Sequence, residues 1–160
     1  MVFLRRPFPL NNWNMCNLQN KIMQNLPEHK KIILFDGVCN LCDNAVQYVI
    51  KRDKKDVFRF VPLQSDLGKE ILNYLKIDAT KTDSIILYEP GQAYFYKSDA
   101  ALEILNELGG LLKWSIIFKI IPSTLRNPIY DYVARNRYKW YGKKDACMIP
   151  TPELKAKFLA

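Results

Sequence analysis

The sequence predicts an α/β domain in which a mixed four-stranded sheet carries helices on both faces, with a helical extension at the C-terminus. Short apolar runs alternate with stretches of helical periodicity from residue 30 to residue 110, as in sheets with crossover helices. The last two runs flank Pro90-Gly91, which predicts an antiparallel hairpin. The 160 residues, 49% hydrophobic and 25% charged, are typical of one globular domain.

The first half of this domain alternates strand and helix. Residues 30–35 form a short apolar run that ends at the turn dipeptide Asp36-Gly37, which predicts a buried strand. The helix that follows carries an apolar face made of Cys42, Ala45, Val46, Val49 and Ile50. Residues 57–61 predict a second strand, and residues 67–75 predict a second amphipathic helix.

The second half consists of the hairpin and one more helix. Residues 84–88 and 93–96 predict its two strands, and Ser98-Asp99 can cap a helix that Gly109-Gly110 closes. The order is βαβαββα, with strands parallel where a helix crosses over and antiparallel at the hairpin. This is the order of the thioredoxin fold.

The two ends of the chain differ from this core. Residues 1–29 are rich in Asn and Gln and carry three prolines, so we expect a peripheral segment, and its internal methionines leave open whether residues 1–22 belong to the native protein. Residues 30–160 form the domain, with 111–160 as its basic helical extension. Residues 1–110 carry 14 Lys and Arg against 13 Asp and Glu, whereas residues 111–160 carry 10 against 3.

The sequence predicts a cytoplasmic protein. No apolar run reaches the roughly 18–20 residues that span a bilayer, since Lys113 and Lys119 interrupt residues 111–121. Pro7 and Pro9 stand where a secretory signal needs an unbroken apolar stretch. In a reducing compartment structural disulfides are rare, and close cysteine pairs are typically catalytic or metal-binding.

Cys39 and Cys42 form a C-x-x-C pair at the point where the first strand turns into a helix. The unpaired N–H groups and the dipole of the helix start stabilise an anion, so we expect Cys39 to be an exposed thiolate that attacks disulfides. Cys42, one turn further on, would resolve the mixed disulfide. Asp36 is a nearby carboxylate that could deprotonate Cys42. The predicted catalytic residues are Cys39, Cys42 and Asp36.

Other interpretations of these residues stay open. The pair could be half of a zinc site completed by His29, Cys16 or Cys147, or it could be structural, which would make the protein a non-catalytic binding module. Asp36 could equally cap the helix or stabilise the turn. We reject phosphoryl transfer, because Leu34 stands where haloacid-dehalogenase-like phosphotransferases carry their nucleophilic aspartate.

With these three residues in place, the sequence resembles the DCC family of predicted thiol-disulfide oxidoreductases, named for the pattern D-x-x-C-x-x-C. The resemblance covers about residues 31–159, with further matching motifs at Phe60–Ser65, Asp83-Ser84, Ser98–Ala101, Val133–Tyr138 and Ile149–Leu154. It implies a thioredoxin-like fold and protein-disulfide reductase activity. The substrate would be a disulfide-containing protein or small molecule, with a thiol as electron donor and with no metal or organic cofactor.

One feature departs from working thioredoxins, which place a cis-proline before the third strand. Residues 81–84 contain no proline. Asp83 either lies near the cysteines instead or caps the strand.

Residues 130–144 interleave basic and aromatic side chains, and three interpretations compete. The basic residues are Arg135, Arg137, Lys139, Lys143 and Lys144, and the aromatic ones are Tyr132, Tyr138, Trp140 and Tyr141. The first interpretation is nucleic-acid binding by phosphate contact and base stacking. The second, which we favour, is a helix that packs its aromatics on the domain and exposes its charges, without specific nucleic-acid affinity. The third adds the apolar residues from Trp114 to Ile120 and predicts peripheral contact with a membrane.

Cys147 in the same tail is either a third redox thiol or an inert buried cysteine.

Overall fold

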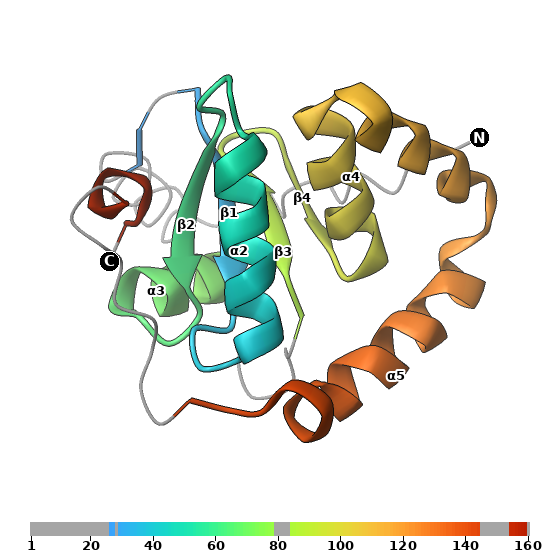
Figure 1. Cartoon of the computed structure of the whole chain (residues 1–160). Helices are drawn as coiled ribbons and strands as arrows, with labels where there is room; N and C mark the ends of the chain where they lie inside the picture. The colour runs from blue at the N-terminus through green and yellow to red at the C-terminus, as the bar shows by residue number, and fades with distance from the viewer. Residues whose placement is uncertain (1–25, 28, 79–83, 145–153, 160) are drawn as a thin grey trace.

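The computed structural model describes residues 26–27, 29–78, 84–144 and 154–159 (Figure 1). Its four strands are β1 (Lys31–Phe35), β2 (Phe58–Pro62), β3 (Ile86–Glu89) and β4 (Ala93–Tyr96). They form one sheet in the order β2-β1-β3-β4. The central strand β1 pairs in parallel with β2 and antiparallel with β3, which in turn pairs antiparallel with β4. The predicted mixed sheet is therefore confirmed.

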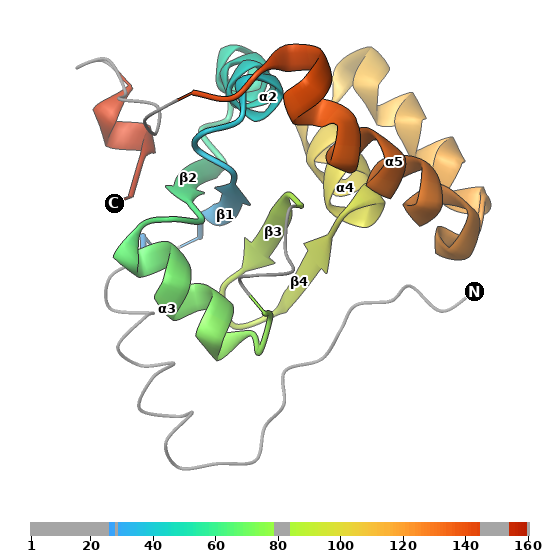
Figure 2. The same cartoon turned by 90° about the horizontal axis from the view of Figure 1, so that it is seen from below.

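Three helices cover the two faces of this sheet, and they are α2 (Asn40–Arg52), α3 (Asp66–Tyr74) and α4 (Ser98–Leu108). Side chains of β1 alternate between the faces, because successive residues of a strand point in opposite directions. Ile32 and Leu34 pack with α3, whereas Ile33 and Phe35 pack with α2 and α4. Figure 2 shows α3 on one side of the sheet and α2 and α4 on the other. The arrangement is the predicted thioredoxin-like βαβαββα, with helices on both faces.

The tight junction of β2 and α3 depends on a glycine. A Cβ at Gly68 would lie 2.2 Å from the carbonyl oxygen of Pro62, so no larger residue fits without moving the backbone. Ser65 caps the helix by accepting a hydrogen bond from the Gly68 N–H at 3.1 Å. This junction also places Gln64, which follows β2, beside the end of β1.

The chain continues after α4 as the predicted helical extension. It consists of the 3-10 helix η1 (Gly110–Ile120), the long helix α5 (Ser123–Tyr141) and the short 3-10 helix η2 (Lys155–Lys157). η1 runs beside α4, and α5 turns back toward the start of α2 (Figure 1). No helix among the described residues is long and apolar enough to cross a membrane.

The packing of α5 differs from the prediction. Tyr132, Trp140 and Tyr141 are exposed, whereas Arg137 is buried. The reason is that Asp99 and Asp36 of the domain form ion pairs with Arg126 and Arg137, which fix the side of α5 that faces the domain. The prediction that the aromatics pack on the domain and the charges face solvent is therefore wrong for the three exposed aromatics and for Arg137, whereas Tyr138 contacts the domain and Arg135, Lys139 and Lys143 face solvent.

Several predicted features lie outside the described residues. They are most of the peripheral N-terminal segment, Cys16, Asp83, Cys147 and most of the motif from Ile149 to Leu154.

Candidate active site

Cys39 and Cys42 lie where β1 passes into α2, as predicted. Cys39 is the N-cap of α2, with an extended backbone at φ −93° and ψ 118°. Its Sγ accepts a hydrogen bond from the backbone N–H of Cys42 at 3.3 Å. The first N–H groups of a helix have no acceptor within the helix, so the Cys39 sulfur supplies one. The C-x-x-C spacing therefore sets one cysteine at the cap and the other one turn into the helix.

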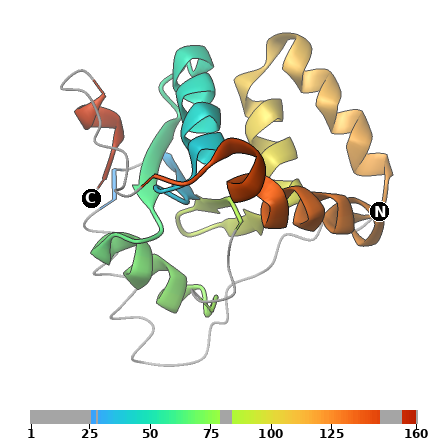
Figure 3. The same ribbon diagram turned by 60° about the horizontal axis from the view of Figure 1, so that its bottom comes forward.

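The exposure of the two cysteines is the reverse of the prediction. Cys39 is fully buried, whereas Cys42 is partly exposed. The segment Gly142–Lys144, which we call the strap, lies directly against Cys39. A φ of +80° at Gly142 turns the chain out of α5, and Lys143 then forms an isolated antiparallel β-bridge with Cys39. Figure 3 shows this part of the chain running past the start of α2.

Three contacts hold the strap in place. The backbone N–H of Lys144 donates to the carbonyl oxygen of Val38 at 2.8 Å. Immediately before the strap, the carbonyl oxygen of Tyr141 accepts a hydrogen bond from Asn40 Nδ2 at 2.8 Å. The Lys144 ammonium forms an ion pair with Asp43, which is itself buried. Access to Cys39 therefore requires these contacts to open.

The environment of Cys42 keeps it protonated. Burial raises the pKa of the Cys42 thiol well above its usual range, and the adjacent Cys39 and the Asp36 carboxylate raise it further. The Arg137 guanidinium has the opposite effect and lowers that pKa. Cys42 is thus a thiol at neutral pH. Arg137 is therefore a charged group that favours the thiolate of Cys42.

Asp36 is a buried carboxylate with four hydrogen-bond donors. Arg137 Nη2 lies 2.6 Å from Oδ2, which also accepts a hydrogen bond from the Tyr138 hydroxyl. Gln64 Nε2 lies 2.8 Å from Oδ1, and the Val38 N–H lies 3.2 Å from the same oxygen. Burial alone would raise the pKa of Asp36, but the hydrogen bond from Tyr138, the other donors and the Arg137 charge together lower it.

This geometry agrees with one of the roles predicted for Asp36. The hydrogen bond from the Val38 N–H stabilises the turn before α2, whereas the capping role falls to Cys39 itself. An ionised carboxylate with a lowered pKa is also a weak proton acceptor. Its contact with Arg137 fixes the guanidinium in place, with 4% of the Arg137 side chain exposed.

Arg137 and Tyr138 are site residues that the sequence assigned to a basic tail. Both come from α5, and Arg137 is separated from Asp36 by 101 residues. The only sign of their role in the sequence is that they belong to the motif Val133–Tyr138, which matches the DCC pattern. Spacing and composition do not distinguish Arg137 from its exposed neighbours Arg135 and Lys139.

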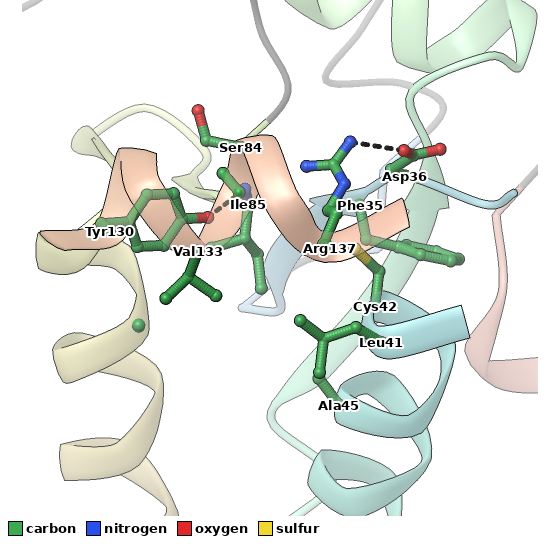
Figure 4. Close-up of a pocket in the computed structure, with 12 residues that line it drawn as sticks. Phe35, Asp36, Leu41, Cys42, Ala45, Ser84, Ile85, Tyr130, Val133 and Arg137 are labelled. Carbon is green, nitrogen blue, oxygen red and sulfur yellow. Dashed lines mark hydrogen bonds and ion pairs between the residues drawn. The ribbon is translucent and has the colours of Figure 1, made fainter. Parts of the chain in front are cut away.

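An apolar cavity of about 280 Å³ opens beside Cys42, between α2, α4 and α5 (Figure 4). Leu41, Ala45, Ala101, Val133 and Ala134 supply much of its apolar wall. Its polar groups include Ser84, Arg137 and the hydroxyl of Tyr130, which accepts a hydrogen bond from the Ile85 N–H at 3.0 Å. The cavity reaches Cys42 but is not lined by Cys39. A small disulfide in it would therefore meet the Cys42 sulfur first.

The described residues contain no cluster of three or more His, Cys, Asp and Glu side chains that could hold a metal ion. Of the further zinc ligands considered, Cys16 and Cys147 lie outside the described residues, and His29 is exposed.

Comparisons with known proteins point to the same chemistry. The model of the family described as DCC1-like thiol-disulfide oxidoreductase matches residues 33–143. The uncharacterized protein YuxK of Bacillus subtilis is 42% identical over 129 residues, covering 81% of this chain and 93% of that protein. A chloroplastic DCC family protein of Arabidopsis thaliana is 34% identical over 121 residues, covering 75% of this chain and 70% of that protein. No solved structure matches the chain significantly.

Proposed function

We propose that this chain, which belongs to the DCC1-like thiol-disulfide oxidoreductase family, reduces disulfides through Cys39 and Cys42 and acts as a protein-disulfide reductase. Family membership supports a redox role and bears out the resemblance inferred from the motifs. The single observation that carries the proposal is the hydrogen bond from the Cys42 N–H to the Cys39 sulfur at the cap of α2. It brings the two cysteines together at the end of a helix that favours negative charge.

The proposed reaction has two exchange steps. The Cys39 thiolate attacks one sulfur of the substrate disulfide, which forms a mixed disulfide and expels the other substrate sulfur as a thiolate. Cys42 then loses its proton and attacks the Cys39 sulfur, which releases the second substrate thiolate and leaves a Cys39–Cys42 disulfide. Two electrons pass to the substrate, and a thiol donor restores the dithiol by the reverse exchange.

The strap and the cavity bear on which sulfur attacks first. Cys39 can attack a protein substrate only after the strap lifts, because Cys39 is fully buried beneath it. Cys42 faces the cavity without such a cover, but its raised pKa makes it the weaker nucleophile. We therefore propose Cys39 as the attacking thiol and Cys42 as the resolving thiol.

Asp36 acts in this proposal chiefly through Arg137. By fixing the guanidinium near Cys42, it keeps in place the charge that favours the resolving thiolate. The alternative role, direct proton transfer from Cys42 to Asp36, makes a different prediction for Asp36→Asn. Loss of a proton acceptor lowers the rate of resolution wherever Cys42 is protonated. A displaced Arg137 instead shifts the pH profile of resolution to higher pH, because the Arg137 charge affects the pKa of Cys42 more strongly than the opposing Asp36 charge does.

The test is disulfide reduction by the full chain and by two single variants. Cys39→Ser should abolish activity, whereas Cys42→Ser should form mixed disulfides that it cannot release. Cys16→Ser and Cys147→Ser are the matched controls and should keep full activity. Mixed disulfides that accumulate in Cys39→Ser and not in Cys42→Ser would reverse the two roles. Full activity without both cysteines, or stoichiometric zinc lost on their replacement, would refute the proposal.

A further inference from the structure

We propose that the outer face of η1 and α5 binds the surface of an anionic lipid bilayer, independently of the redox chemistry. The face carries large apolar side chains that are between 59% and 88% exposed, namely Leu111, Trp114, Ile120, Leu125, Ile129 and Tyr132. Thirteen of the fourteen large exposed hydrophobic side chains among the described residues lie between 111 and 141, and Tyr48 is the other. Apolar exposure concentrated in one part of a protein marks an interaction surface.

The orientation of α5 is fixed by contacts on its inner side. Arg126 forms an ion pair with Asp99 at 2.7 Å, the Tyr130 hydroxyl binds the Ile85 N–H, and Arg137 binds Asp36. Leu125, Ile129 and Tyr132 recur at helical spacing on another side of the helix, where all three are exposed. These contacts keep the three apolar side chains in solvent, and rotation of the helix to bury them would break all three contacts.

η1 is likewise held by a polar contact while its large apolar side chains are exposed. Lys119 forms an ion pair with Glu103 of α4, and both side chains are less than one-fifth exposed. Trp114, which is 75% exposed, and Leu111, which is 88% exposed, lie outside this contact. No residue of η1 is buried. Ion pairs thus hold the inner side of both helices against the domain, while large apolar side chains of both remain in solvent.

The positive charge of residues 111–144 indicates that the partner of this face is anionic. Residues 111–144 contain eight Lys and Arg and one acidic residue, Asp131, which gives a formal net charge of +7. Lys113, Arg135, Lys139 and Lys143 are exposed, and no carboxylate among the described residues forms an ion pair with them. An apolar helix face with basic residues beside it is typical of helices that lie in the interface of a membrane.

Other occupants fit less well. A second copy would place the same charge of +7 against itself, which is unfavourable. Residues 1–25 carry Arg5, Arg6 and Lys21 and no acidic residue, so they repel this face as well. Nucleic acid would satisfy the basic groups but would leave Leu125 and Ile129 in contact with water, because aliphatic side chains do not stack on bases. A bilayer with anionic lipids supplies both negative head groups and acyl chains.

The experiment measures partitioning of the full chain onto vesicles of phosphatidylcholine alone and of phosphatidylcholine with phosphatidylglycerol. We expect binding to the anionic vesicles and little to the neutral ones. The apolar variant Trp114→Ser/Leu125→Ser/Ile129→Ser should lower the partition coefficient by about a hundredfold or more. Its matched control is Tyr48→Ser, which removes the exposed aromatic outside the face and should bind like wild type. Circular dichroism verifies that each variant is folded.

A second set of variants tests the charge. Lys113→Gln/Arg135→Gln/Lys139→Gln should lower binding about fivefold per residue, or about a hundredfold in total. The control, Lys51→Gln/Lys54→Gln/Lys55→Gln, removes three exposed lysines from α2 and the turn after it and should have a much smaller effect.

The same experiment contains the results that would overturn the proposal. One is absence of binding to anionic vesicles. Another is unchanged binding of the apolar variant, which would reduce the interaction to adsorption by charge alone. A dimer in solution that the apolar variant abolishes, without vesicle binding, would assign the face to a second copy. Tight binding to a single-stranded oligonucleotide at physiological salt, without vesicle binding, would assign it to nucleic acid.

Discussion

Replacing Asp36 by Asn should destabilise the fold strongly, because it leaves Arg137 buried without its counter-charge. The two side chains are 6% and 4% exposed and lie 2.6 Å apart, so solvent does not screen the pair. Removal of one partner of a buried ion pair costs about 3–5 kcal/mol, whereas domains of this size are stable by about 5–15 kcal/mol. Urea unfolding at pH 7 should therefore show a loss of about 3–5 kcal/mol for Asp36→Asn.

A double-mutant cycle separates this pair from general disturbance of the site. Arg137→Gln should cost a similar amount, because it leaves the Asp36 carboxylate buried without its charged partner. The double variant should lose less than the sum of the two single variants, since no isolated charge then remains. The control is Lys69→Met, which removes an exposed ion pair to Asp66 at 3.7 Å and should leave the free energy of unfolding unchanged.

The pH dependence gives an independent check. The pKa of Asp36 is lowered in the folded protein, so its contribution to stability is present above the unfolded carboxyl pKa of about 3.9 and is lost as pH falls toward the folded pKa. The stability difference between wild type and Asp36→Asn should therefore be constant from about pH 5 to 8 and should narrow below about pH 4. A loss smaller than about 1 kcal/mol at pH 7, or a difference that does not narrow in acid, would refute this account of the pair.

The remaining predictions concern the strap and the junction of β2 with α3. Lys144→Gln removes the ion pair with Asp43 and should raise the rate of Cys39 alkylation in the folded protein by up to about fivefold, measured by mass spectrometry of the labelled peptides. Lys143→Gln, the matched control, should leave that rate unchanged, and equal rates in both variants would show that the ion pair does not hold the strap. Gly68→Ala should destabilise the protein by about 2 kcal/mol or more in urea unfolding, because its Cβ would meet the carbonyl oxygen of Pro62, and a neutral effect would show that the junction can relax.

Much of the fold could be predicted because its determinants are local. The apolar run of β1 and the periodicity of α2 each indicate their own structure, and the turn between them places Cys39 at a helix start. The hairpin follows from Pro90-Gly91 in the same way. Predicted boundaries differ by a few residues, as for β3, which begins at Ile86 rather than at residue 84, because strand ends depend on pairing partners that the local sequence does not show.

The parts that could not be predicted depend on residues far apart in the chain. Cys39 is at a position that is normally exposed, and it is buried by residues more than a hundred positions later. For α5 the spacing of residues defines two faces, but only the tertiary structure decides which face meets the domain. The usual expectation that aromatics pack inward fails for Tyr132, Trp140 and Tyr141. The orientation of α5 is set instead by Asp36 and Asp99, which attract Arg137 and Arg126.

The distance along the chain between Asp36 and Arg137 has a consequence for the order of events during synthesis. The strands and helices up to residue 108 are synthesised before the last fifty residues, so any structure that they form early lacks α5 and the strap. Until α5 is complete, Cys39 has no strap above it and Asp36 has no counter-charge. A nascent or truncated chain would therefore expose a reactive cysteine that the finished protein encloses. Completion of the chain, rather than formation of the sheet, is then the step that buries the Cys39 thiol.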